Sequence, residues 1–127
     1  MMSPPAQIEM RPAAAADADG IRSLVRAAYA KWVPVVGREP LPMRADYGRA
    51  IREHRVSLLY ADGLPAGVIE LIIGADYLFI ENVAVDPHHQ GRGFGHRLLA
   101  HAEETAIAHG LRELRLITNG AFASNIA

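Results

Sequence analysis

The sequence predicts a mixed α/β fold in which helices flank a mainly antiparallel central sheet. Apolar runs on both sides of Asp62-Gly63 indicate a hairpin of two antiparallel strands. Residues 21–29 repeat apolar side chains at three- and four-residue steps, which is typical of an amphipathic helix. A strand, a glycine-rich loop, a helix and another strand then follow between residues 77 and 118, and this order predicts a parallel crossover.

The composition predicts one globular domain over residues 1–127. Half of the residues are apolar and 21% are charged, and 127 residues suffice for one core. The formal charge of −1 gives no general attraction for nucleic acid or anionic lipid. There are no cysteines for disulfides or thiolate chemistry, and no apolar run approaches the roughly 20 residues of a membrane span. With no signal-peptide pattern at the start, we expect a cytoplasmic protein without nucleic-acid or membrane partners.

Local patterns give the expected order of elements. A helix that begins near residue 21, with Asp17 or Asp19 as its cap, should end before Pro34. Gly110 should end the last helix. We expect strands at 8–11, 56–61, 66–73, 77–85 and 111–118, a loop at 34–42, and further helices at 44–54 and 94–109.

The glycine-rich loop from Gln90 to Gly95 is the most informative motif. It comes directly after a strand and directly before a helix, so successive backbone N–H groups can converge on an anion. Glycine allows close approach, and a helix N-terminus adds about half a positive charge. A pyrophosphate could therefore be bound although the loop contains no lysine.

Two other phosphate-binding motifs fit this loop less well. A P-loop requires Lys and then Ser or Thr at the helix start, whereas His96 and Arg97 follow Gly95. A dinucleotide fingerprint requires a glycine where His96 stands, and it follows the first strand of a parallel unit rather than hairpins. A loop that only turns the chain is the remaining alternative.

The loop and its flanks resemble the acetyl-CoA motif of the GNAT superfamily of N-acetyltransferases. The resemblance rests on Val83-Ala84-Val85-Asp86-Pro87, then Gln90-x-x-Gly93-x-Gly95, then Leu98-Leu99. It extends over most of the chain, and it implies a GNAT-like fold with acetyl-CoA as cosubstrate. The implied reaction is transfer of an acetyl group to a primary amine of a small molecule or protein, by direct attack in a ternary complex.

The resemblance also implies which residues contact the cofactor. The N–H groups from Gly91 through His96 would bind the pyrophosphate, and the backbone of Val83 and Val85 would pair with the pantetheine arm like an added strand. The expected cofactor-binding residues are Val83, Val85, Gln90, Gly91, Arg92, Gly93, Phe94, Gly95, His96 and Asn125.

Acetyl transfer needs a base that takes the proton of the acceptor amine. Glu81 lies in the expected cofactor strand and is the candidate general base, with Asn82 as a second candidate catalytic residue. An outward charge on a half-exposed strand is the alternative for Glu81, because a bulge would change which face each residue occupies. Glu70 is a weaker candidate on the neighbouring strand.

The acceptor cannot be identified from the sequence. Tyr29, Trp32 and Tyr77 are candidate substrate contacts, but each could equally be structural. No metal is expected, because the helix containing His101 lacks the second histidine of a zincin motif, and His88 and His89 are adjacent in a turn.

The sequence ends at Ala127, before the tyrosine segment and last strands of the family pattern. We therefore expect a C-terminally short GNAT-like sheet, slower transfer without the tyrosine that protonates the CoA thiolate, and homo-oligomers formed through the edge strand at 111–118. Two alternatives to an active enzyme stay open. One is an acetyl-CoA-binding module without turnover, and the other is a nucleotide-binding regulatory domain.

Overall fold

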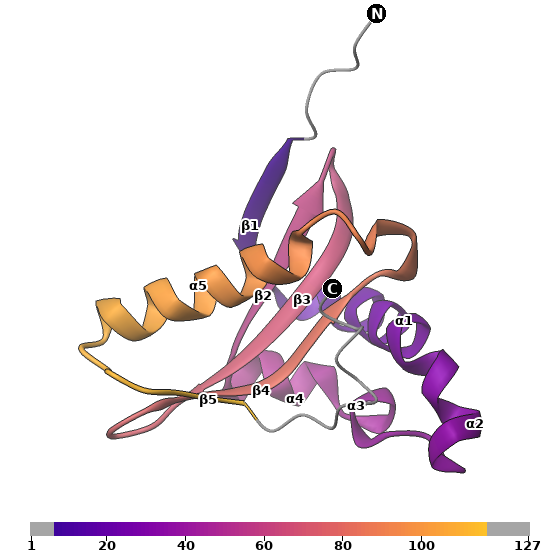
Figure 1. Ribbon diagram of the computed structural model, residues 1–127, viewed down its shortest axis with the longest axis horizontal. Helices are drawn as coiled ribbons and strands as arrows, with labels where there is room; N and C mark the ends of the chain where they lie inside the picture. The colour runs from indigo at the N-terminus through magenta and orange to yellow at the C-terminus, as the bar shows by residue number, and fades with distance from the viewer. Residues whose placement is uncertain (1–6, 117–127) are drawn as a thin grey trace, which may run out of the picture.

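A computed structural model describes residues 7–116 and places one five-stranded sheet between two layers of helices (Figure 1). The strands are β1 Ile8–Pro12, β2 Arg55–Ala61, β3 Leu64–Ile73, β4 Leu78–Val85 and β5 Leu114–Leu116. They lie in the order β1-β2-β3-β4-β5, antiparallel throughout except for the parallel β4–β5 pair. The predicted mixed, mainly antiparallel sheet is confirmed.

The helices divide between the two faces of the sheet. They are α1 Ala18–Tyr29, α2 Val33–Val36, α3 Leu41–Arg44, α4 Tyr47–Glu53 and α5 Phe94–Ala108, with 3-10 turns η1 Ala15–Asp17, η2 Ala30–Trp32 and η3 Pro87–His89. Buried side chains of α5, such as Leu98, pack on Leu59 and Ile69 on one face. Those of α1, α3 and α4 pack on Leu58 and Val68 on the other face.

The segment between α1 and β2 differs from the sequence-based expectation. Helix α1 ends before Pro34 as predicted, but Pro34 then lies in the first turn of α2, where its missing N–H would have no partner anyway. The prediction of a single helix over 44–54 is wrong at its N-terminal end. Its residues are divided between α3 and α4, because Asp46 leaves helical geometry and caps α4 by accepting the N–H of Arg49 at 3.1 Å.

The predicted hairpin turn and the end of the last helix have the left-handed backbone geometry that glycine favours. Asp62 and Gly63 have φ values of 52° and 82°, the left-handed pair that a two-residue hairpin requires. Asp17 directly precedes α1, but its carboxylate accepts the N–H of Ala14 at 2.8 Å and so caps η1 instead. Gly110 follows α5 with a φ of 69° and donates its N–H to Ile107, which closes the helix as predicted.

Helix α5 packs closely on the sheet at Gly67 in β3. A Cβ atom at Gly67 would lie 2.9 Å from Leu98 Cδ1 and 3.3 Å from the Ala84 carbonyl oxygen. Leu98 is fully buried, so it cannot move aside without disturbing the core. The absence of a side chain at Gly67 therefore sets the distance between α5 and the sheet.

We predict that Gly67→Ala and Gly20→Ala change stability in opposite directions. The first should lower the free energy of unfolding by about 1–3 kcal/mol through overpacking. The second should raise it by about 0.5–1 kcal/mol, because Gly20 lies in α1 with nothing within 4 Å of its Cβ position. Urea denaturation of both variants measures these values, and a Gly67→Ala protein as stable as the parent would contradict the packing argument.

Candidate active site

A β-bulge in β4 organises the centre of the sheet. Glu70 of β3 pairs with Asn82, but the next residue, Leu71, pairs with Ile80, so Glu81 is an extra residue without a cross-strand partner. Glu81 is exposed, whereas Asn82 and Val83 on its C-terminal side are buried. The predicted base thus occupies the bulge itself and is accessible from solvent.

The hydrogen-bonding pattern between β3 and β4 leaves the N–H and C=O groups of two β4 residues facing away from β3. The N–H of Asp86 donates to the Ala66 carbonyl at 2.8 Å, which fixes the alternation of bonded and non-bonded pairs along this antiparallel ladder. Val85 and Val83 fall in the non-bonded pairs, opposite Gly67 and Ile69. Their N–H and C=O groups therefore point toward the other edge of β4.

The described residues cover that other edge of β4 only in part. Within residues 7–116, β5 pairs with Leu78, Phe79 and Ile80, and not with the part of β4 that follows the bulge. The Val85 carbonyl accepts instead from Gln90 Nε2 at 3.1 Å. The backbone groups of Val83 and Val85 thus lie where an extended ligand could add to the sheet.

The glycine-rich loop connects this edge to α5. Gly91 and Gly93 have φ values of 81° and 80°, in the left-handed region that favours glycine, and a Cβ atom at either position would have nothing within 4 Å. Gly93 is the N-cap of α5. The N–H groups from Gly91 to His96 bond to no carbonyl within residues 7–116, so this turn presents unpaired donors at a positive helix end.

The turn before the loop is held by Asp86. Its carboxylate accepts the backbone N–H of His88 at 2.9 Å and caps η3. Burial alone would raise the pKa of Asp86, but hydrogen bonds from His88 outweigh burial and keep that pKa below its ordinary value. The ionised carboxylate fixes the chain direction between β4 and the loop.

A buried polar triad lies on the α1 face of the sheet, directly beside the bulge. Asn82 Oδ1 accepts from the Tyr29 hydroxyl at 3.1 Å, and Asn82 Nδ2 donates to the Tyr47 hydroxyl at 3.1 Å. The Tyr47 hydroxyl in turn donates to the Pro42 carbonyl. Burial, followed by the nearby Glu70 carboxylate, raises the pKa of Tyr47, so its hydroxyl stays protonated and can keep donating.

A partly buried pair adjoins this triad. His54 Nδ1 lies 2.6 Å from Glu70 Oε2, and the Glu70 side chain is 8% exposed. Glu70 is the cross-strand neighbour of Asn82. The weaker base candidate is therefore bonded to a histidine and enclosed, while Glu81 is open to an acceptor.

The sequence-predicted residues are only partly brought together. Val83, Val85 and the loop from Gln90 to His96 form one continuous segment, with Glu81 and Asn82 at its near end. Tyr29 contacts Asn82, whereas Tyr77 lies at the opposite end of β4 with the Arg115 guanidinium 4.0 Å from its ring centre. Trp32 lies in η2, and Lys31 Nζ is 5.3 Å from the centre of its ring. Asn125 lies outside the described residues.

Sequence reasoning missed Tyr47 and His54. Each stands in or just after α4 without a motif around it, and only the packing of α4 against β2 and β3 brings them to Asn82 and Glu70. Within residues 7–116, no group of three or more His, Cys, Asp or Glu side chains is placed to hold a metal ion. No helix in the same range is long and apolar enough to cross a membrane.

Comparisons with known proteins identify the family and the fold of the chain. The sequence profile of the Acetyltransferase (GNAT) family matches residues 21–126. The PaiA N-acetyltransferase from Thermoplasma acidophilum in complex with coenzyme A has a TM-score of 0.80 and 21% identity, over 92% of this chain and 82% of its own. The aminoglycoside N-acetyltransferase AAC(6')-Iy in complex with CoA has a TM-score of 0.69 and 15% identity, over 95% of this chain and 83% of its own.

A third similar structure is longer than this chain. N-acetylglutamate synthase from Neisseria gonorrhoeae, complexed with coenzyme A and N-acetylglutamate, has a TM-score of 0.69 and 27% identity. The similar region covers 94% of this chain and 27% of the synthase. A search of curated proteins found no match.

We predict that Asn82→Ala lowers the free energy of unfolding by about 2–4 kcal/mol, because it leaves buried hydroxyl groups without their shared partner. Tyr47→Phe should destabilise by a smaller amount. The double variant should cost at least about 1 kcal/mol less than the sum of the single variants, since the two groups bond directly. Thermal denaturation measures all three, and additive effects would contradict a coupled triad.

Proposed function

Because the chain belongs to the Acetyltransferase (GNAT) family and is therefore an acyltransferase, we propose that it transfers the acetyl group of acetyl-CoA to a primary amine of a small molecule. One observation carries the proposal. The outward-facing N–H and C=O groups of Val83 and Val85 lead directly into a loop whose N–H groups, at the start of α5, have no partner among residues 7–116. This arrangement suits a ligand that has an extended amide-containing arm and a pyrophosphate.

The pyrophosphate would bind at the loop from Gly91 to His96. Two glycines in left-handed geometry and the N-terminus of α5 supply converging N–H donors. The loop therefore does not need a buried cation. The exposed Arg92 could add a charge-assisted bond to a phosphate oxygen. The Gln90 amide, which now donates to the Val85 carbonyl, would give up that bond to the cosubstrate.

The pantetheine arm would then run along β4 from Val85 past Val83 toward the bulge. Its amides would pair with the outward groups of these two residues in the manner of an added strand. This direction carries the thioester to Glu81 and Asn82. The bulge thus lies where the acetyl group would be delivered.

The reaction at the bulge would be direct attack of the amine on the thioester carbonyl. The C–N bond forms, the C–S bond breaks, the exposed Glu81 carboxylate takes a proton from the amine directly or through a water molecule, and the thiolate leaves on CoA and is then protonated. Asn82 would act as a positioning residue, since both ends of its amide are held by Tyr29 and Tyr47.

A small-molecule acceptor is supported by the similar structures. One is an aminoglycoside N-acetyltransferase, and another contains N-acetylglutamate, so related folds accept amines of very different shape. Tyr29 and Trp32, at the end of α1 and in η2, lie on the face of the sheet that also carries Asn82. We propose this side as the approach for the acceptor.

We predict that Gly93→Asn weakens CoA binding roughly tenfold or more. Asparagine tolerates the φ of 80° at this position, so the fold should survive, but its side chain would occupy the approach of the pyrophosphate to the loop. Isothermal titration calorimetry with CoA measures the effect.

Gly110→Asn is the matched control. Its φ of 69° is similar and its Cβ position is equally open, but it lies at the other end of α5. Equal affinity of the parent and Gly93→Asn for CoA would contradict the loop site. Tighter binding of NAD or ATP than of CoA would instead favour a nucleotide-binding protein.

We predict that Glu81→Gln lowers kcat roughly 10²–10⁴-fold while the CoA dissociation constant changes little, since a base acts on the amine and not on the cofactor. A panel of amino acids, polyamines and aminoglycosides, assayed by the thiol released, first identifies an acceptor. Glu103→Gln, an exposed carboxylate on α5, serves as the control and should keep parental rates. A Glu81→Gln variant that turns over at the parental rate would show that Glu81 is an exposed charge without a role in catalysis.

A further inference from the structure

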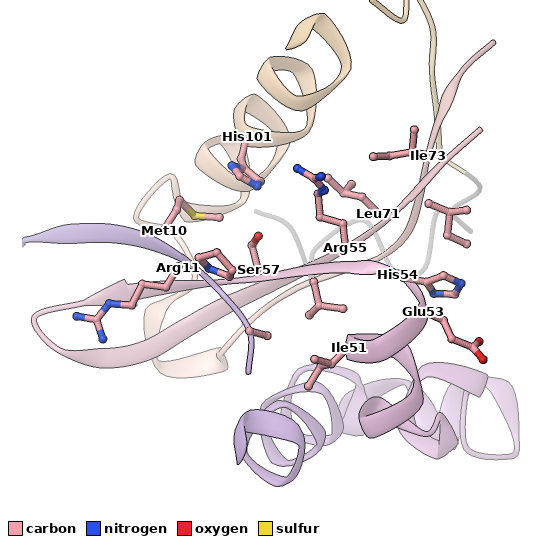
Figure 2. A pocket seen from close by; sticks show the side chains of 14 residues that line it. Met10, Arg11, Ile51, Glu53, His54, Arg55, Ser57, Leu71, Ile73 and His101 are labelled. Atoms are coloured by element: carbon pink, nitrogen blue, oxygen red, sulfur yellow. The ribbon is translucent and has the colours of Figure 1, made fainter. Parts of the chain in front are cut away.

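A cavity of about 700 Å³ opens at the edge of the sheet, where β1 has ended and β2 is beginning (Figure 2). Its walls come from the ends of β1, α4 and β3, from the start of β2, and from His101 in the middle of α5. None of its lining residues belongs to the glycine-rich loop or to β4. The cavity is therefore separate from the proposed acetyl-transfer site.

Three polar groups face this cavity without partners among the described residues. His101 Nε2 is buried and has no hydrogen bond. Arg55 makes no ion pair within residues 7–116, and the Ser57 side chain, almost fully buried, makes no side-chain hydrogen bond there. Figure 2 shows His101 descending from α5 toward Arg55, which rises from β2 on the same side as Ser57.

The other charged groups of the lining are already neutralised. Arg11 bonds to Glu9 at 2.8 Å, and Glu53 bonds to Arg49 at 2.9 Å. His54 is bonded to Glu70. Among the described residues, the uncompensated charge of the cavity is therefore the guanidinium of Arg55.

His101 adds a neutral polar group to this charge. Burial is the main cause that lowers the pKa of His101, and the Arg55 charge lowers it further, while Glu104 opposes both. At neutral pH the ring is therefore uncharged and can carry its single proton on Nε2. Met10, Leu71 and Ile73 supply an apolar wall beside these groups.

We propose that this cavity binds a small molecule that carries a carboxylate on a short aliphatic body. The planar Arg55 guanidinium matches a carboxylate with two parallel hydrogen bonds. The Ser57 hydroxyl adds a donor, and His101 Nε2–H, which is buried and has no partner among the described residues, would add another once its ring turns toward the cavity. The aliphatic body would lie against Met10, Leu71 and Ile73.

The charge balance favours a carboxylate over a phosphate. A phosphate monoester carries nearly two negative charges at neutral pH, and the described residues line this cavity with only one unpaired cation. A carboxylate carries one. Inorganic phosphate would also leave the aliphatic wall exposed to water. The alkyl chain of a bound carboxylate would cover that wall.

The test is a titration of the ¹⁵N-labelled protein with sodium isovalerate at constant ionic strength, followed by ¹H–¹⁵N NMR. We expect saturable shifts at Met10, Ser57 and His101, and none at Gly91 or Gly93. Isovaleramide, which has the same shape without the charge, should bind at least roughly tenfold more weakly. Inorganic phosphate should also bind more weakly than isovalerate.

Variants separate the proposed contacts from general charge effects. Arg55→Gln should weaken isovalerate binding roughly tenfold or more, and Ser57→Ala a few-fold. Arg52→Gln, which removes an exposed arginine of α4 outside the cavity, should leave it unchanged. The proposal is overturned by the absence of saturable shifts, by equal binding of isovaleramide, by tighter binding of phosphate, or by parental affinity in a folded Arg55→Gln protein.

Discussion

The single extra residue at Glu81 is the constraint on which the rest of the site depends. Without the bulge, strict alternation from Ile80 would turn Asn82 toward α5 and Val83 toward α1. With it, Val83 packs under α5 while Asn82 faces α1 and reaches Tyr29 and Tyr47. One inserted residue therefore brings an exposed carboxylate, a fixed amide and a strand edge that residues 7–116 leave open to the same point of β4.

Backbone geometry, rather than charged side chains, defines the proposed cofactor surface. The outward peptide groups of Val83 and Val85 follow from the antiparallel phase with β3, and the donors of the loop follow from left-handed geometry at Gly91 and Gly93. A chain with a formal charge of −1 can present such a surface, because a helix end and converging N–H groups attract an anion locally.

Helix α5 connects two regions of different chemistry. Its first turn carries the loop donors, and about two turns later His101 faces the cavity beside Arg55. Close contact between Leu98 and Gly67 holds the helix on the sheet between these two points. The polar groups of each region are therefore set by the same packed element, although they share no residues.

The sequence by itself determined the fold class, the hairpin at Asp62-Gly63 and the glycine-rich loop before α5, because turn chemistry and hydrophobic periodicity act between near neighbours. Only the tertiary structure decided the phase of β4, since a bulge depends on how β3 and β4 pair and leaves no local signal. The same holds for Tyr47, His54 and His101. Their neighbours Asn82, Glu70 and Arg55 are distant in the chain, and packing of helices on the sheet brings them together.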